Sequence, residues 1–197
     1  MNRVKLALGA AALALLSGCV APTGPVEVTR FHVPDTSQLG KGSIAVEPAP
    51  GQDPKSLEWQ TYQAAVQRQL ALVGYTEAAS GQGGQVAELR LSRGTYQPER
   101  SSGPVSVGVG GSTGSYGSGV GLGIGLNLSP RPGPQVQTEL GVIIKDRLSG
   151  QALWEGRASF AVRASSPLAD SALGAAKMSE ALFQGFPGQS GETIEVK

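Results

Sequence analysis

Residues 140–158 read LGVIIKDRLSGQALWEGRA, and this stretch indicates the architecture more clearly than any other part of the chain. Apolar residues alternate with polar ones on both sides of the DRLSG turn, which predicts two antiparallel strands over 136–148 and 152–162. Gly150 suits the turn, because glycine adopts a positive φ without steric cost. Asp146 has the residue type of a general base, but a turn carboxylate that binds its own backbone amides explains it more simply.

Period-two alternation predicts further strands on both sides of this pair. Four precede it, over 26–33, 42–47, 75–78 and 86–96, and a short one follows over 193–196. His32 falls on the polar face of the first strand. An exposed or edge histidine is the simpler interpretation there, because the chain has no second histidine with which to share a ligand.

Two segments have the spacing of amphipathic helices. The first starts with Asp53 as N-cap and Pro54 at the first helical position, and Gly74 is its C′ residue. Its predicted apolar stripe comprises Leu57, Tyr62, Val66, Leu70 and Val73. Trp59 and Tyr62 are interpreted as core residues, since an aromatic pair on an amphipathic helix faces the core more often than it forms a ligand platform.

The second helix spans 168–183 and is stopped by the segment 185–187, Gly-Phe-Pro. This order of strands and helices predicts one α+β domain over residues 26–197. We expect a largely antiparallel sheet, two amphipathic helices on one of its faces, and a glycine-rich β-hairpin insert. A chain of about 170 residues is long enough for a single core.

The glycine-rich insert spans residues 103–133 and contains 11 glycines. Aliphatic residues alternate with Gly or Ser in two halves, which is a strand pattern. A dinucleotide-binding loop is rejected because no helix pattern follows the glycines. The favoured interpretation is a packed or partly mobile hairpin, and the alternative is a hairpin that contacts or inserts into a membrane.

The N-terminus predicts where the protein is sent. Residues 1–18 combine two basic residues with an uncharged apolar run, as a secretory signal peptide does. The run would form a helix of about 16 Å, too short for a hydrocarbon core of about 30 Å. The segment 16–19, Leu-Ser-Gly-Cys, resembles the bacterial lipobox, so Cys19 is the predicted lipid attachment site and 19–25 an acylated tether.

Val20 follows the cysteine where Asp would favour retention in the inner membrane. We therefore expect the inner leaflet of the outer membrane, with the domain facing the periplasm. The alternative is an ordinary secretory peptide with a cysteine at this place by accident.

The charge balance excludes several function classes. The net charge is +1, and without the signal peptide 14 basic residues face 15 acidic ones. A chain so nearly neutral lacks the footprint of a nucleic-acid-binding protein. One cysteine and one histidine leave no Cys-rich or His-clustered metal site and no histidine-based triad. We expect no metal, no cofactor and no catalytic residue.

Carboxylates are the remaining candidates for catalysis. They stand at predicted strand edges, turns and helix starts, without a spacing typical of paired catalytic acids: Glu47, Asp53, Glu58, Glu88, Glu139, Asp146 and Glu155. Trp154 beside Glu155 has the residue types of a sugar site, but a tryptophan near a hairpin turn is usually a core plug. The sequence predicts no enzymatic activity, and a buried carboxylate pair with strongly shifted pKa values would contradict this.

Several segments together resemble a bacterial lipoprotein family. They are a helix ending in Gly-Tyr (62–75), a strand (87–91), a strand followed by an Asp-x-x-x-Gly turn and Leu-Trp-x-Gly (140–158), and a closing helix before Phe186. From Val26 to Pro187 the chain is similar to the family called domain of unknown function 4136. The resemblance implies an envelope lipoprotein and no established catalytic residue.

These observations predict an outer-membrane-anchored periplasmic lipoprotein that serves as a non-enzymatic binding or accessory module, with an unidentified envelope protein as partner. One alternative is an oligomeric lipoprotein whose hairpin acts in a membrane pore or as a secretion accessory. A second alternative, by analogy of fold alone, is an accessory lipoprotein of an envelope lipid transporter.

Overall fold

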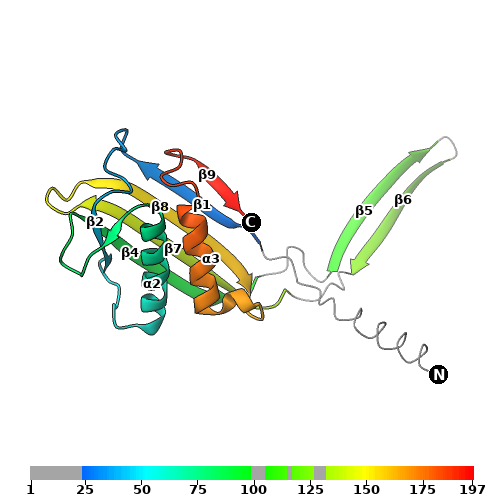
Figure 1. The fold of residues 1–197 in the computed structure, drawn as a ribbon. Coiled ribbons are helices and arrows are strands. Elements are labelled where there is room, and N and C mark those ends of the chain that lie inside the picture. The colour runs from blue at the N-terminus through cyan, green and yellow to red at the C-terminus, as the bar shows by residue number, and fades with distance from the viewer. Residues whose placement is uncertain (1–23, 99–104, 115–116, 127–131) are drawn as a thin grey trace, which may run out of the picture.

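The computed structural model describes residues 24–98, 105–114, 117–126 and 132–197 (Figure 1). In chain order the elements are β1 (Val26–His32), β2 (Ser43–Pro48), α2 (Leu57–Leu72), β3 (Thr76–Glu77), β4 (Gln85–Tyr96), β5 (Val105–Gly114), β6 (Gly117–Leu126), β7 (Gln135–Asp146), β8 (Ala152–Arg163), the 3-10 turn η1 (Pro167–Ala169), α3 (Ser171–Phe183) and β9 (Thr193–Val196).

Seven strands form one sheet in the order β3-β2-β4-β7-β8-β1-β9. β2 runs parallel to β3 and β4, and the other neighbouring pairs of this sheet are antiparallel. α2 and α3 lie side by side across one face of the sheet (Figure 1). The predicted α+β domain, with a largely antiparallel sheet and both helices on one face, is confirmed.

The core lies between the helices and the sheet, and it receives every second residue of the long strands. Trp154 on β8 is at its centre and is 1% exposed. Its ring stacks on Phe183 of α3 with centroids 5.4 Å apart, and its Nε1 donates a hydrogen bond of 3.0 Å to the carbonyl of Pro187. The predicted role of Trp154 as a core plug is confirmed.

The first helix starts later than predicted. Ser56 is the N-cap in place of Asp53, and its hydroxyl accepts a hydrogen bond from the N–H of Trp59. The Asp53 carboxylate instead accepts from the N–H of Lys55 in the turn before the helix. Leu57 is 80% exposed and does not belong to the apolar stripe, because at 3.6 residues per turn it lies on the side of the helix opposite the buried Val66.

Other predictions for α2 are confirmed. Gly74 follows the helix with a φ of 107°, and a Cβ there would lie 2.4 Å from the carbonyl oxygen of Gly40. Only glycine fits this conformation and this close approach. Trp59 and Tyr62 are 4% and 1% exposed, so both belong to the core as predicted.

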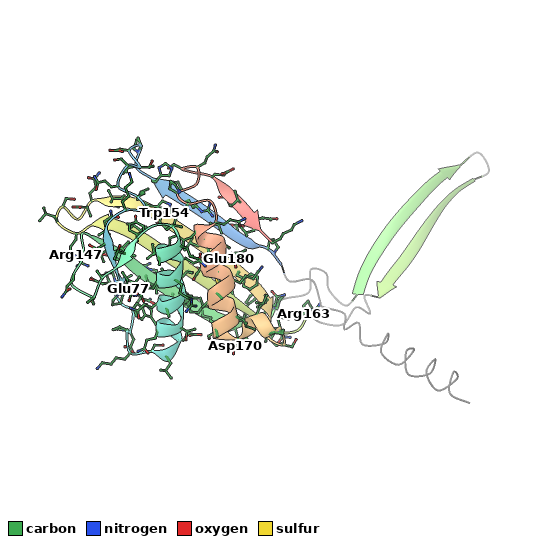
Figure 2. The ribbon with its side chains drawn as sticks, in the orientation of Figure 1. Glu77, Arg147, Trp154, Arg163, Asp170 and Glu180 are labelled. Atoms are coloured by element: carbon green, nitrogen blue, oxygen red, sulfur yellow. The ribbon has the colours of Figure 1, made fainter. Side chains whose placement is uncertain are left out.

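The second helix also begins later than predicted. The predicted start at Leu168 is wrong, because residues 167–169 form a separate 3-10 turn. Asp170 is the N-cap of α3 (labelled in Figure 2), and its carboxylate accepts a hydrogen bond from the N–H of Ala172. The helix ends at Phe183, as predicted.

Strand β1 departs from its predicted faces. Arg30 is buried on the core side, while Phe31 is 46% exposed on the other side. The Arg30 guanidinium donates to the carbonyls of Leu182 and Ala181 in the last turn of α3, at 3.0 and 2.9 Å. Burial lowers the pKa of Arg30, and the negative end of the helix favours its charge. By strand alternation His32 shares the core side with Arg30, so its predicted place on the polar face is wrong.

β5 and β6 fall within the predicted insert and pair antiparallel with each other as a separate two-stranded sheet. Their register places Val105 opposite Leu126 and Val107 opposite Ile124. The residues that connect this hairpin to the domain, 99–104 and 127–131, lie outside the described ranges, and its predicted packing on the domain stays a prediction.

Candidate functional site

The face of the sheet opposite the helices is polar and hollowed, and we call it the open face. A hollow of about 690 Å³ lies on it, a size typical of ligand pockets. The side chains of β1, β4, β7 and β8 at this hollow are Glu27, Thr29, Glu88, Arg90, Ser92, Glu139, Gly141, Ile143, Glu155, Arg157 and Ser159. They alternate with the core residues of the same strands, which assigns them to one face.

The middle of the hollow is a row of three residues. Gly141 on the central strand β7 lies directly beside Arg90 of β4 and Arg157 of β8 in the strand register. Neighbouring strands are about 4.8 Å apart, so the α-carbons of the two arginines are about 10 Å apart with the glycine between them. The floor of the hollow is therefore bare backbone between two guanidinium groups.

On one side of this row the charges are paired. The Glu155 carboxylate accepts a hydrogen bond of 2.8 Å from Nε of Arg157, and the two groups form an ion pair with Nη2 2.5 Å from the same oxygen. Glu88 pairs with Lys145 at 2.7 Å. Each pair is partly exposed to water, so we expect it to contribute little to stability.

On the other side of the row lie Glu139 on β7 and Glu27 on β1. Arg90 is the member of the row on β4. Among the described residues none of these three side chains takes part in an ion pair. Glu139 accepts one hydrogen bond, of 3.3 Å, from Nε2 of Gln137. The open face thus keeps the Arg90 guanidinium and two carboxylates outside any described ion pair, and Arg157 contacts Glu155 through Nε and Nη2 only.

The structure divides the seven candidate carboxylates. It brings three of them to the hollow, namely Glu88, Glu139 and Glu155, and it places four elsewhere, namely Glu47, Asp53, Glu58 and Asp146. Glu58 pairs with Arg93 at 2.5 Å near the start of α3. The four outside the hollow have local structural partners.

Two of these carboxylates have depressed pKa values. Burial acts to raise the pKa of Glu47, but hydrogen bonds from the N–H of Gly81 and from Arg147 (labelled in Figure 2) outweigh it, so the pKa lies below its usual value. The Ser149 hydroxyl and N–H donate to the Asp146 carboxylate and lower its pKa. Gly150 has a φ of 72°, so the turn interpretation of this segment is confirmed.

The arginines of the hollow were not among the predicted site residues. Arg90 and Arg157 occupy polar positions in strands where apolar and polar residues alternate. A single sequence shows that such residues face away from the core, but not that they lie beside each other. Gly141 offered a signal, because a glycine in the middle of a strand marks a bulge or a close approach of a ligand or another backbone.

Cys19 lies outside the described residues, together with the signal peptide over 1–18. Within the described part of the chain no group of three His, Cys, Asp or Glu residues is placed to hold a metal ion. The His32 imidazole lies near backbone carbonyls, with Nε2 3.3 Å from the oxygen of Gly188. None of the helices in the described ranges is both long enough and apolar enough to span a membrane.

Comparison with known proteins finds a relative of this chain. The chain is 31% identical over 220 residues to an uncharacterized protein of Zymomonas mobilis, and the match covers 89% of this chain and 81% of that protein. The chain belongs to that protein's family. No family model matches the chain, so its resemblance to domain of unknown function 4136 stays a prediction.

Two solved structures are distant neighbours of this family member. A PDZ domain protein from Parabacteroides distasonis is 14% identical with a TM-score of 0.48, over 94% of this chain and 41% of that one. The chain therefore spans less than half of that protein's length. A PelC dodecamer from Paraburkholderia phytofirmans is 14% identical with a TM-score of 0.41, over 78% of this chain and 93% of that one.

Proposed function

We propose that the protein is an outer-membrane-anchored periplasmic lipoprotein whose domain is a non-enzymatic binding module of the cell envelope. The anchor rests on the signal-peptide pattern of residues 1–18 and on the lipobox-like setting of Cys19. Acyl chains on Cys19 would hold the domain at the bilayer, since each buried methylene contributes about 0.8 kcal/mol. Val20 supports the outer membrane as its destination.

The observation that carries the binding role is the hollow of the open face. Helices cover one face of the sheet, whereas the other exposes arginines and glutamates around a bare glycine floor. Charged groups that are in no ion pair among the described residues, such as Arg90, Glu139 and Glu27, are suited to recognising a charged partner. Display on a short tether would raise the local concentration of this face for envelope components.

A non-enzymatic role is supported by the surroundings of the carboxylates. Catalytic carboxylic acids need pKa values raised toward the working pH. The pKa values of Glu47 and Asp146 are lowered instead, and Glu88 and Glu155 pair with cations.

One observation favours the oligomeric pore or secretion accessory as a second candidate. β5 and β6 have ten residues each, which is the length of about 9–11 residues that a tilted strand needs to cross a hydrocarbon core. Their register sets three aliphatic pairs opposite one another in the half nearer Val105, with Gly or Ser positions between them. Stable rings or ion conductance from the purified protein in bilayers would establish this candidate over the first.

Crosslinking in intact cells followed by mass spectrometry tests the proposed function. We expect the chain to capture one envelope molecule reproducibly, and the reversal of charge in Arg90→Glu to reduce that capture. Arg68→Glu on the exposed side of α2 is the matched control and should leave the capture unchanged. A dedicated binding role would be contradicted if the unchanged protein and both variants captured only abundant envelope proteins, and in equal amounts.

A further inference from the structure

Gly141 is a residue that the fold does not require. A Cβ built on it meets nothing closer than the Cβ of Arg90 at 3.7 Å, an ordinary contact, and its φ is not positive. Glycine in the middle of a strand costs about 0.5–1 kcal/mol relative to alanine. The glycine therefore weakens the central strand and leaves the floor of the hollow open.

Gly156 on the next strand provides the contrast. A Cβ there would lie 2.2 Å from the Trp154 ring and 2.8 Å from the Leu182 side chain, so core packing alone explains this glycine. No such explanation applies to Gly141. A strand glycine without a packing role often marks a bulge, a bend, or a close approach of a ligand or another backbone. The pairing of β7 with both neighbours is continuous through Gly141, so no bulge explains it and a close approach is the remaining role.

The groups around Gly141 have an ordered charge pattern. Arg90 and Arg157 flank it, and guanidinium groups bind carboxylates in a bidentate manner. Arg90 is in no ion pair among the described residues, and Arg157, which contacts Glu155 through Nε and Nη2, has further N–H groups to donate. Two residues further along the strands lie Glu139 on β7 and Glu27 on β1, which are suited to a cation. Ser159 of β8 lies between these two glutamates in the register and is a diagonal neighbour of Gly141, so the anionic and cationic seats are about 7–8 Å apart.

We propose that the open face binds a short zwitterionic peptide, with its carboxylate over Gly141 between Arg90 and Arg157 and its ammonium group at Glu139 and Glu27. An extended chain covers about 3.3–3.6 Å per residue, so a dipeptide of about 7 Å has the length to join the two seats. The glutamates would repel a purely anionic ligand and the arginines a purely cationic one. This inference rests on the proposed binding role of the open face and names the class of ligand.

Titration of the purified chain with dialanine, followed by calorimetry and by amide NMR shifts, tests this proposal. We expect saturable binding, with the largest shifts on β4, β7 and β8. N-acetyl-dialanine and dialanine amide each lose one charge, and each should bind about tenfold more weakly or worse, because a hydrogen bond to a charged group is lost. Phosphoethanolamine, with its two charges closer together, should also bind more weakly.

Variants connect the binding to the hollow. Arg90→Gln removes an exposed guanidinium, and Gly141→Ala raises the floor without a steric clash, so both should fold and bind dialanine about tenfold more weakly or worse. Arg68→Gln on α2 is the control and should bind as the unchanged chain does. Three results would overturn the proposal: blocked peptides that bind as well as dialanine, phosphoethanolamine that binds more tightly than dialanine, or no saturable shift up to about 10 mM dialanine. A partner captured in cells through the open face would leave the proposed function standing in that case.

Discussion

Alanine in place of the two mid-strand glycines should have opposite effects on stability. The Cβ of Gly156→Ala would lie 2.2 Å from the Trp154 ring, well inside van der Waals contact. The tryptophan cannot turn away freely, because Phe183 and Phe186 stand against it with ring centroids 5.4 and 5.2 Å away. Forced overpacking of a core costs about 1–3 kcal/mol, and such a close contact belongs at the upper end. At about 2–4 °C per kcal/mol for a domain of this size, the melting temperature should fall by about 6–12 °C.

Gly141→Ala on the open face is the matched change. It places the same methyl group in ordinary contact and removes the conformational freedom of a strand glycine, so we expect a gain of about 0.5–1 kcal/mol. Urea unfolding of both variants measures the two free energies of unfolding, provided that the dependence of the free energy on urea concentration has the same slope as in the unchanged chain. A loss for Gly141→Ala as large as that for Gly156→Ala would refute the conclusion that only one of these glycines serves packing.

Four further outcomes are expected. Arg30→Met leaves two carbonyls at the end of α3 without their donor and should lower the free energy of unfolding by about 2 kcal/mol or more in urea. The pKa of Glu47 is lowered in the folded state, so the stabilising contribution of its carboxylate is complete above about pH 4.3, the unfolded value, and is lost as the pH falls through the folded-state pKa. Glu47→Gln removes this contribution, so the urea midpoint should drop less between pH 7 and pH 3 than it does in the unchanged chain. Cys19→Ser should move the protein out of the detergent phase, and an unchanged membrane fraction would show that this cysteine is not the anchor. Deletion of residues 104–128 should leave the domain folded with a modestly lower melting temperature, because β5 and β6 pair with no strand of the seven-stranded sheet; complete unfolding would place the hairpin in the core.

The sequence predicted the elements more accurately than their ends. The β7–β8 hairpin, the short β9 and the burial of Trp154 follow from alternation and turn chemistry, which are local properties. The start of α2 does not, because Asp53 and Ser56 are N-caps of similar strength, and the Asp53 carboxylate binds the N–H of Lys55 in the preceding turn. The exposure of Leu57 has a different reason, since the helical period itself puts it opposite Val66 and the predicted stripe did not keep that period.

The candidate site depended on strand order, which a single sequence does not contain. Arg90, Gly141 and Arg157 become neighbours only because β7 lies between β4 and β8. The buried place of Arg30 also could not be predicted, since the strand pattern assigns a charged residue to the outer face. Its partners are backbone carbonyls of a helix about 150 residues later in the chain.

Residue-specific photo-crosslinking in intact cells tests the central claim, that the open face is the binding surface of an anchored envelope module. A photoreactive residue at Ser159 reports on the hollow, and one at Gln60 on the exposed side of α2 is the control. The account predicts a discrete, reproducible adduct from Ser159 and none from Gln60. An adduct from Gln60 with none from Ser159 would contradict it.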